Sequence, residues 1–265
     1  MTQWVLSGLR AGVRTTRYPA WPDDSPGLSP GLPSGRALVA GELARVVDRC
    51  PTGALIRQDH RVVVDPRRCV HCLRCARGED AVNWEPGYEW AIMAENANRG
   101  ETAPASFGPA FARSLHVRVV DAGDCGACLH EVKQLANPYY NLHRLGFFIT
   151  PTPRQADILL VVGPGTDQMR AALEQSYAAM PTPRKVIAVG TCALSGGVFS
   201  PSFACSAGVG SIVPVDIEVP GHPPPPLAIL HALLVAAGRA SPAELVAAPV
   251  DRATSERGTT PEHGP

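Results

Sequence analysis

The sequence has no excess of charge, no long apolar run and no export signal. Its 24 basic side chains equal its 24 acidic ones, which argues against binding nucleic acid through bulk charge. A membrane-spanning helix needs about 18 consecutive apolar residues, and the longest candidate, residues 227–238, is shorter and contains His231. No basic segment followed by an apolar stretch opens the chain. We therefore expect a cytoplasmic protein that does not itself cross a bilayer.

Motifs for nucleotide binding and for substrate activation are also missing. Neither Gly-x-x-x-x-Gly-Lys nor Gly-x-Gly-x-x-Gly occurs, so we expect no nucleotide despite several glycines in the C-terminal half. The chain has no Ser/His/Asp arrangement and no nickel-binding pair of Cys-x2-Cys motifs beyond the cysteines described below. Substrate chemistry is therefore expected on another subunit.

Proline, glycine and cysteine are abundant instead. The 27 prolines and 25 glycines among 265 residues predict long connecting segments. Eight cysteines in a chain expected in a reducing compartment favour metal or redox chemistry over disulfides. They form two sets, one in the N-terminal third and one in the remainder.

Composition divides the chain into five parts. Segments rich in Pro, Gly and Ser flank two units with apolar cores, and the C-terminal residues lack the side chains that a core needs. We predict an N-terminal extension and linker (1–36), a small α+β domain (37–95), a linker (96–112), an α/β domain (113–240) and a disordered tail (241–265).

The larger unit alternates short apolar runs with helical segments. Strands are predicted at 116–121, 156–162, 185–189 and 212–219, and helices at 131–135, 167–180 and 227–237. Strands that alternate with helices form a parallel sheet covered on both faces. We therefore predict an α/β fold with a flavodoxin-like parallel sheet.

Three cysteines of the first set lie on one tight loop. Cys69, Cys72 and Cys75 have the spacing Cys-x2-Cys-x2-Cys, which brings three thiolates toward one point as an iron–sulfur cube requires. Cys50, which precedes Pro51, stands where the ferredoxin arrangement supplies a distant fourth ligand. The four predict one [4Fe–4S] cluster. A structural zinc is the alternative, although zinc prefers two separated cysteine pairs.

The segments around these cysteines, 50–54 and 65–75, resemble a bacterial two-cluster ferredoxin that has lost one cluster. The ligands of the lost cluster would fall at Ala40, Leu43, Val46 and Glu79. All of them belong to the same cluster, so we expect apolar side chains to fill its place. Residues 9–19 and 86–91 also resemble the ferredoxin-like subunits of formate hydrogenlyase. The resemblance implies a ferredoxin-like fold for the small domain.

The cysteines of the second set follow two predicted strands. Cys125 and Cys128 come after the strand at 116–121, and Cys192 comes after the strand at 185–189. Open α/β sheets build their sites at the carboxyl ends of the strands, so we expect these loops to adjoin. By itself, a Cys-x2-Cys pair also fits a redox dithiol or half of a zinc site.

Three runs in this unit, 152–164, 190–199 and 213–221, are similar to the small subunit of group 4 nickel–iron hydrogenases and to the homologous 20 kDa subunit of complex I. The resemblance covers about residues 116–236. It implies a second [4Fe–4S] cluster that faces a large subunit, with Cys125, Cys128 and Cys192 as ligands. It also implies catalytic roles beside that cluster for Glu131 and Arg154. The alternatives are a helix-start carboxylate and a solvated charge.

The fourth ligand of the second cluster departs from the family pattern. Where the family has Val-Pro-Gly-Cys-Pro-Pro, this chain has Val219-Pro-Gly-His-Pro-Pro. The resemblance places His222 at the ligand position, and histidine ligates iron in some clusters. Cys205 is the rival ligand, and an open iron site is a third alternative. We expect Cys205 to be a small buried apolar side chain.

These features together predict an iron–sulfur electron-transfer subunit of a hydrogenase- or complex I-like oxidoreductase, with two [4Fe–4S] clusters on one chain. The expected partners are a hydrogenase-like large subunit and membrane subunits, at the cytoplasmic face of the membrane, with no nucleic acid. The alternative is a stand-alone soluble ferredoxin-type carrier. An apolar surface around Cys125 would favour the complex, because such surfaces mark permanent interfaces.

Overall fold

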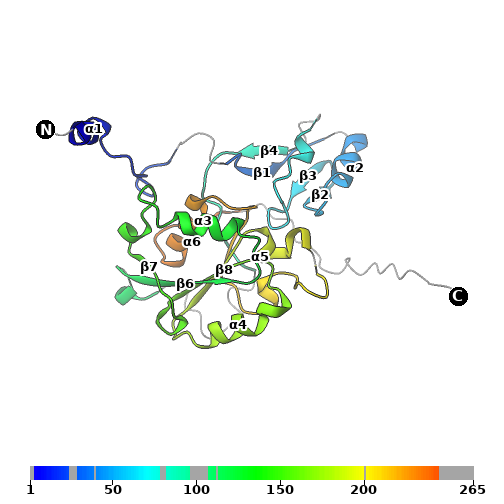
Figure 1. The fold of residues 1–265 in the computed structure, drawn as a ribbon. Helices are drawn as coiled ribbons and strands as arrows, with labels where there is room; N and C mark the ends of the chain where they lie inside the picture. Colours follow the sequence, from blue (N-terminus) through cyan, green and yellow to red (C-terminus); the bar gives the residue numbers. More distant parts are fainter. Residues whose placement is uncertain are drawn as a thin grey trace.

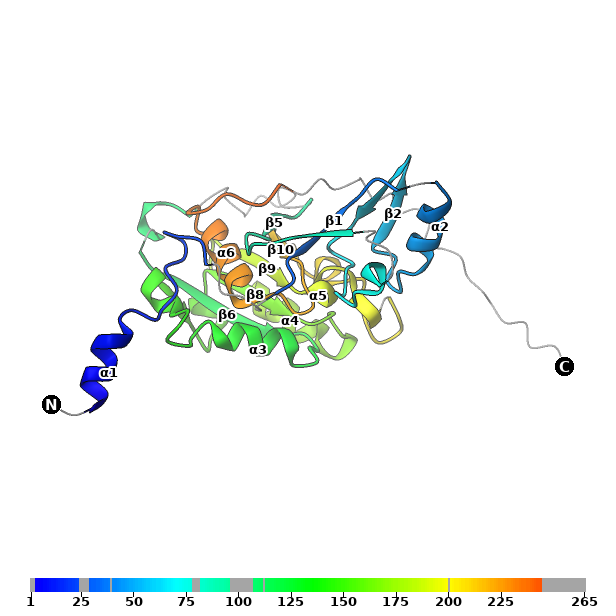
Figure 2. The same ribbon diagram turned by 90° about the horizontal axis from the view of Figure 1, so that it is seen from above.

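The computed structural model describes residues 3–23, 29–38, 40–77, 82–95, 107–111, 113–199 and 201–244. They form a large sheet domain with a small cysteine-bearing unit at one end (Figure 1, Figure 2). Helix α1 (Gln3–Ala11) projects from the body and has no buried side chain. No helix in these ranges is long and apolar enough to cross a membrane.

A six-stranded sheet organises the larger part. Its strands are β5 (Ile92–Met93), β6 (Leu115–Asp121), β7 (Phe147–Ile149), β8 (Ile158–Val162), β9 (Lys185–Val189) and β10 (Ile217–Val219). Their spatial order is β5-β10-β9-β8-β6-β7, and all pairs are parallel except β5 with β10. The five parallel strands therefore follow the flavodoxin-like order 2-1-3-4-5. The predicted α/β fold is confirmed.

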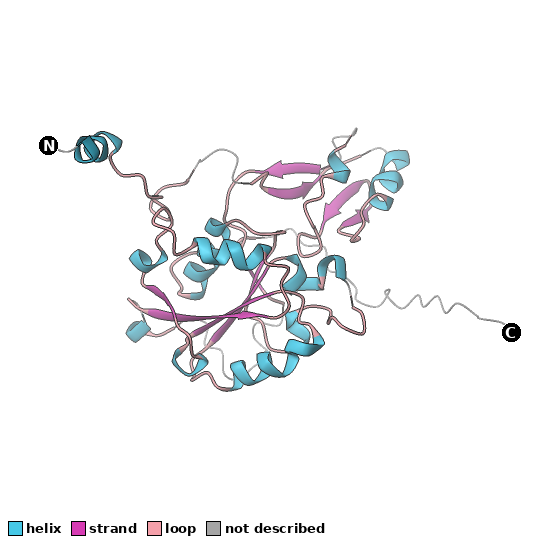
Figure 3. Ribbon diagram, viewed as in Figure 1, coloured by secondary structure: helices cyan, strands magenta, loops and turns pink. Residues whose placement is uncertain are grey.

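Helices cover both faces of the sheet (Figure 3). On one face lie α3 (Ala127–Gln134) and α6 (Pro226–Ala236), and on the other lies α4 (Asp167–Ala178). Every residue of β8 and β9 is buried, as expected for a parallel strand packed on both sides. Every residue of α6 is buried as well, which fits a sequence that is apolar except for His231.

Strands β5 and β7 were not predicted, and two predicted elements have clearly different bounds in the structure. The strand expected at 212–219 is reduced to β10, because Pro214 has no N–H for the ladder and the Asp216 carboxylate accepts the N–H of Val186 at 2.7 Å. The helix expected at 131–135 begins earlier, at Ala127. The Asp124 carboxylate accepts backbone N–H groups at its start, from Gly126 and Leu129. The early start places Cys128 inside the helix.

The small unit consists of one helix and two antiparallel strand pairs. Helix α2 (Ala40–Asp48) accompanies β1 (Leu32–Gly35) paired with β4 (Val82–Glu85), and β2 (Leu55–Gln58) paired with β3 (Arg61–Val64). Leu43 and Val46 are fully buried in its core. Apolar side chains thus occupy these two positions of the lost cluster, while Glu79 and the side chain of Ala40 lie outside the described residues.

Strand pairings cross the boundaries drawn from the sequence. β1 lies before residue 37 yet pairs with β4 of the small unit, and β5 lies before residue 95 yet pairs with β10 of the large sheet. In the tail, Ala243 donates its N–H to the carbonyl of Ala91 at 2.7 Å. The remainder of the tail and most of the second linker lie outside the described residues, so the five-part division stays a prediction.

Buried His231 joins α6 to two neighbouring segments. Its Nδ1 accepts the N–H of Ala91 at 3.2 Å, and its Nε2 lies 3.0 Å from the carbonyl oxygen of Ser241. This pair of contacts fits a neutral ring with its proton on Nε2, since a protonated Nδ1 would face another N–H. Burial accordingly lowers the pKa of His231 below its ordinary value.

Acid should therefore destabilise the fold through His231. Because the pKa is lower in the folded chain than in the unfolded chain, the unfolded chain binds more protons as the pH falls below about 6.5. The free energy of unfolding then decreases until the pH reaches the folded-state pKa. We expect the melting temperature to fall less steeply from pH 7 to pH 5 in His231→Asn than in the parent chain. An equally steep fall of the melting temperature in the two chains would contradict the proposed role of His231.

Candidate metal centres

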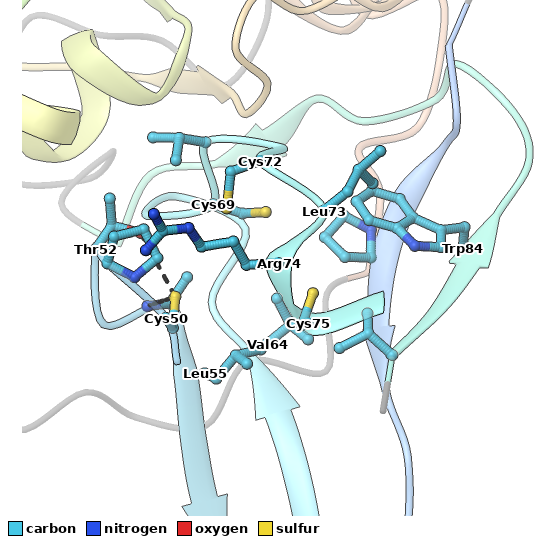
Figure 4. Close-up of a pocket in the computed structure, with 15 residues that line it drawn as sticks. Cys50, Thr52, Leu55, Val64, Cys69, Cys72, Leu73, Arg74, Cys75 and Trp84 are labelled. Carbon is cyan, nitrogen blue, oxygen red and sulfur yellow. Dashed lines mark hydrogen bonds between the residues drawn. The ribbon is translucent and has the colours of Figure 1, made fainter. Parts of the chain in front are cut away.

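The four cysteines of the first set line one pocket in the small unit (Figure 4). Cys50 follows α2, and its Sγ accepts the N–H of Ala54 at 3.2 Å. Cys69, Cys72 and Cys75 lie on the chain that follows β3. The structure therefore brings together all four predicted ligands of this set.

Two left-handed residues shape the cysteine loop. His71 and Leu73 stand between the cysteines and have φ angles of 49° and 58°. This conformation costs a non-glycine residue about 1–2 kcal/mol, and such strain clusters at ligand-binding sites. The tight coil fits a loop that places three thiols around one bound group.

Burial disfavours the ionised form of these thiols. Burial first, and then the charges of Cys75, Cys50 and Cys72, raise the pKa of the Cys69 thiol to about 12. The pKa of Cys75 is raised for the same leading reason. Thiolates gathered in a buried pocket need positive charge to stabilise them, and a bound metal supplies it. The donor set therefore fits a metal group.

The four cysteines could serve a single ion or a polynuclear group. Zinc needs four ligands at about 2.0–2.3 Å from one atom, whereas each cysteine of a cube binds a different iron. Within the described ranges, no three His, Cys, Asp or Glu side chains already stand in the shell of one metal ion. The sulfur donors that line the pocket fit either kind of group.

The second set lies at the carboxyl edge of the sheet. Cys125 and Cys128 follow β6, and Cys192 lies in α5 (Thr191–Ser195), directly after β9. Cys128 and Cys192 are buried, whereas Cys125 is exposed. Burial, followed by neighbouring negative charges, raises the pKa of both buried thiols, that of Cys192 to about 11. The structure brings these three predicted ligands within electrostatic reach of one another.

Glycines allow the loops to approach these thiols. Gly190 has a φ of 88°, and a Cβ there would lie 2.5 Å from the Sγ of Cys128. Gly197 has a φ of 57°, and its Cβ would lie 2.9 Å from the Sγ of Cys192. Contacts under 3.0 Å leave no room for a side chain. Close packing around the cysteines therefore explains these two glycines.

Gly190→Ala should displace the Cys128 thiol. The substitution combines a steric clash with a backbone conformation that essentially only glycine adopts, which costs other residues about 1–3 kcal/mol. We expect a lower melting temperature and less iron bound at the second set. Gly210→Ala is the matched control, because its φ is not positive and its nearest neighbour would be 3.9 Å away. A Gly190→Ala chain with the iron content and melting temperature of the control would contradict the packing described.

Two residues compete for the fourth position of the second set. His222 is half-buried after β10, and the carbonyl of its neighbour Gly221 accepts the N–H of Thr191 at 2.8 Å. Cys205 is also half-buried, contrary to the expectation of a buried apolar side chain, and its segment forms an isolated bridge with Thr166. The charge of Cys205 contributes to the raised pKa of Cys192. His222 and Cys205 therefore both remain candidates for the fourth ligand of the second set.

Glu131 and Arg154 occupy different places. Glu131 lies one helical turn after Cys128, and burial raises the pKa of its carboxyl. Its charge also contributes to the raised pKa of Cys128. Arg154 is exposed on the 3-10 helix η4 (Pro153–Gln155), which precedes β8. It is therefore on the amino-terminal side of the strands, and the structure does not bring it to the second set.

Sequence reasoning missed the contacts that join the two sets. Thr191 donates its hydroxyl to the carbonyl of Cys69 at 2.8 Å, and Ser195 donates to the carbonyl of Arg67 at 2.9 Å. Each contact joins residues more than 120 positions apart, 122 and 128 respectively. No local pattern could reveal them.

His71 lies between the sets as well. Its ring meets those of Trp84 and Trp90 edge-on, with centroids 5.6 and 6.1 Å away. Burial and then the charge of His222 lower the pKa of His71 to about 4. Its Nε2 is buried without a hydrogen-bond partner among the described residues. Such an orphaned donor or acceptor in a native site is consistent with an absent bound group.

The fold and site define a class of protein: a flavodoxin-like domain with a cysteine site at the carboxyl edge of its sheet, joined to a four-cysteine unit. Residues 125–236 match the family model described as NADH ubiquinone oxidoreductase, 20 Kd subunit. The chain belongs to this family and is an oxidoreductase subunit.

Curated relatives agree with this membership. The chain is 42% identical over 124 residues to the "Probable membrane-bound hydrogenase subunit mbhJ" of Pyrococcus furiosus, covering 47% of this chain and 74% of that protein. It is 38% identical over 126 residues to formate hydrogenlyase subunit 7 of Escherichia coli, covering 48% of this chain and 49% of that protein. A chain in the structure of the membrane-bound sulfane sulfur reductase, an archaeal respiratory membrane complex, is 27% identical, with a TM-score of 0.43 and coverage of 49% and 74%. The predicted resemblance of the large domain is confirmed, whereas that of the N-terminal unit to ferredoxin-like subunits stays a prediction.

Proposed function

We propose that this chain is the iron–sulfur electron-transfer subunit of a hydrogenase- or complex I-like membrane complex. One [4Fe–4S] cluster is held by Cys50, Cys69, Cys72 and Cys75, and a second by Cys125, Cys128, Cys192 and His222. Such clusters, when bound, supply one-electron redox chemistry, with potentials tuned by charge, hydrogen bonds and solvent exposure. The protein holds the ligands and restricts water around them.

The observation that carries this proposal is the direct contact between the two cysteine sets. Thr191, which precedes the ligand Cys192, donates a hydrogen bond to the carbonyl of the ligand Cys69 at 2.8 Å. Two independent redox sites need no such contact. An electron that enters at one set has a short bonded path to the other, which is what a relay requires.

An apolar surface near the second set supports a permanent partner. Val198, Phe199 and Phe203 follow α5 and are 56%, 50% and 100% exposed. Contiguous exposed apolar residues mark interaction sites. We assign this surface to a hydrogenase-like large subunit, which performs the substrate chemistry. These side chains follow Cys192 in the chain, whereas the apolar surface expected from the sequence was around Cys125.

Glu131 and Arg154 receive different roles. Burial raises the pKa of the Glu131 carboxyl, and the charge of this group acts on Cys128, which suits a residue that responds to the charge of the site. Arg154 is exposed at the opposite edge, where a solvated charge is the simpler role.

Attachment to the membrane is assigned to partner subunits at the cytoplasmic face. Helix α1 carries Trp4 and Leu9, which are 76% and 73% exposed, and it projects away from the sheet domain (Figure 2). An amphipathic helix with exposed tryptophan suits a contact with a membrane subunit or its interface. We assign α1 to this contact.

Anaerobic co-expression with a hydrogenase-like large subunit tests the proposed function. We expect the two chains to co-elute in size-exclusion chromatography, and we expect Phe199→Asp with Phe203→Asp to separate them. Trp21→Asp is the matched control, because Trp21 is 64% exposed far from α5 in the sequence. A stable monomer that never co-elutes, yet exchanges electrons with soluble donors, would favour the stand-alone carrier.

A further inference from the structure

Helix α5 connects the two cysteine sets through its first residue. Thr191 is fully buried and directly precedes Cys192. Its hydroxyl lies 2.8 Å from the carbonyl oxygen of Cys69, within the normal range for an O–H···O hydrogen bond. The same side chain therefore contacts the backbone of one set and is covalently linked to the other.

Thr191 also contacts the loop that carries His222. Its N–H donates to the carbonyl of Gly221 at 2.8 Å, and its hydroxyl oxygen lies 3.1 Å from the same carbonyl oxygen. Because a hydroxyl has a single proton, the shorter contact, to Cys69, is the better hydrogen bond. Thr191 therefore contacts the segment of Cys69 and the loop of His222, and it directly precedes Cys192.

A second group of contacts fixes this junction. Ser195, one turn further along α5, donates to the carbonyl of Arg67 at 2.9 Å. The Arg67 guanidinium is paired with Glu218 at 2.5 Å and with Glu95 at 3.3 Å. Charge-assisted pairs of this kind are short and directional. The segment that leads into the cysteine loop is therefore held against the sheet domain at Arg67 as well as at Cys69.

We propose that Thr191 is the positioning residue through which one electron passes between the two cysteine sets. The route consists of covalent bonds from Cys192 to the Thr191 hydroxyl and one hydrogen bond to the carbonyl of Cys69. One cluster loses one electron as the other gains it, and no bond or proton is exchanged. This inference rests on the proposed function, which places a cluster in each set.

Three variants distinguish a role of Thr191 in electron transfer from a role in stability alone. Thr191→Val removes the hydroxyl while keeping a branched side chain of similar volume, and Thr191→Ser keeps the hydroxyl. Ser195→Ala removes the neighbouring donor, which contacts Arg67 rather than a ligand. A merely structural role for the junction would make Thr191→Val and Ser195→Ala behave alike.

The test uses the anaerobically loaded full chain. Iron content and the midpoint potentials of both clusters are measured first, and the redistribution of one photochemically injected electron is then followed by freeze-quench electron paramagnetic resonance (EPR). We expect Thr191→Val to slow the redistribution several-fold with unchanged potentials and iron content. Thr191→Ser and Ser195→Ala should keep the parent rate.

If the electron redistributes between the clusters of Thr191→Val at the parent rate, the inference is overturned. An equal slowing of electron redistribution in Ser195→Ala would overturn it as well. The parent chain supplies a further test that needs no variant. Two clusters connected by the route through Thr191 should interact magnetically when both are reduced, and a spectrum that is the plain sum of two isolated signals would also overturn the inference. An iron content too low for two clusters would instead contradict the proposed function.

Discussion

Replacing Cys50 by alanine should abolish the [4Fe–4S] signal of the small unit and lower the iron content from about eight to about four atoms per chain. The other three cysteines lie on one loop, whereas Cys50 approaches the pocket from the end of α2. No other cysteine lines this pocket. Without the Cys50 thiolate, one corner of the cube has no protein ligand.

The second cluster should survive this change, because its proposed ligands lie at the sheet edge. Arg74→Gln is the matched control, since Arg74 lines the same pocket between two ligands but supplies no thiolate. The measurement is iron and acid-labile sulfide per chain, together with the EPR spectrum of the reduced protein. A Cys50→Ala chain with the parent iron content and both signals would exclude Cys50 as a ligand.

Replacing His222 by cysteine should lower the midpoint potential of the second cluster while the cluster is retained. A neutral imidazole contributes no negative charge, whereas a thiolate contributes one, so the histidine favours the reduced form. The potential of the parent chain should also depend on pH, and this dependence should weaken in His222→Cys. Redox titrations at several pH values measure both effects.

The rival assignment predicts the opposite pattern. Cys205 is half-buried, and its charge acts on Cys192, so it is the nearest alternative thiolate on electrostatic grounds. If Cys205→Ala destroys the second cluster while His222→Ala leaves its spectrum and potential unchanged, Cys205 is the ligand. We expect Cys205→Ala to leave both unchanged.

The position of the second set could be predicted because it follows from local patterns. The apolar runs that end at Asp121 and Val189 mark buried strands, and loops at the carboxyl ends of parallel strands meet. Cys128 and Cys192 accordingly lie at one edge. The strand expected at 212–219 was too long because Val213 and Val215 are buried like strand residues, although they lie outside β10.

The junction between the sets could not be predicted, because it depends on tertiary contacts. Thr191 and Cys69 are 122 positions apart, and a single hydroxyl donor has no periodicity that a sequence could display. The five-residue helix α5 is also too short to give a helical pattern. Arg154 was assigned to the site by resemblance, although the strand predicted at 156–162 already placed it on the amino-terminal side of the sheet, where the structure has it.

The central claim is that one chain holds two [4Fe–4S] clusters, and its most direct test is chemical analysis of the anaerobically purified protein. We predict about eight iron and eight sulfide per chain, with an EPR spectrum to which both clusters contribute on reduction. About four iron and four sulfide with a single signal, or stoichiometric zinc without sulfide, would contradict the account.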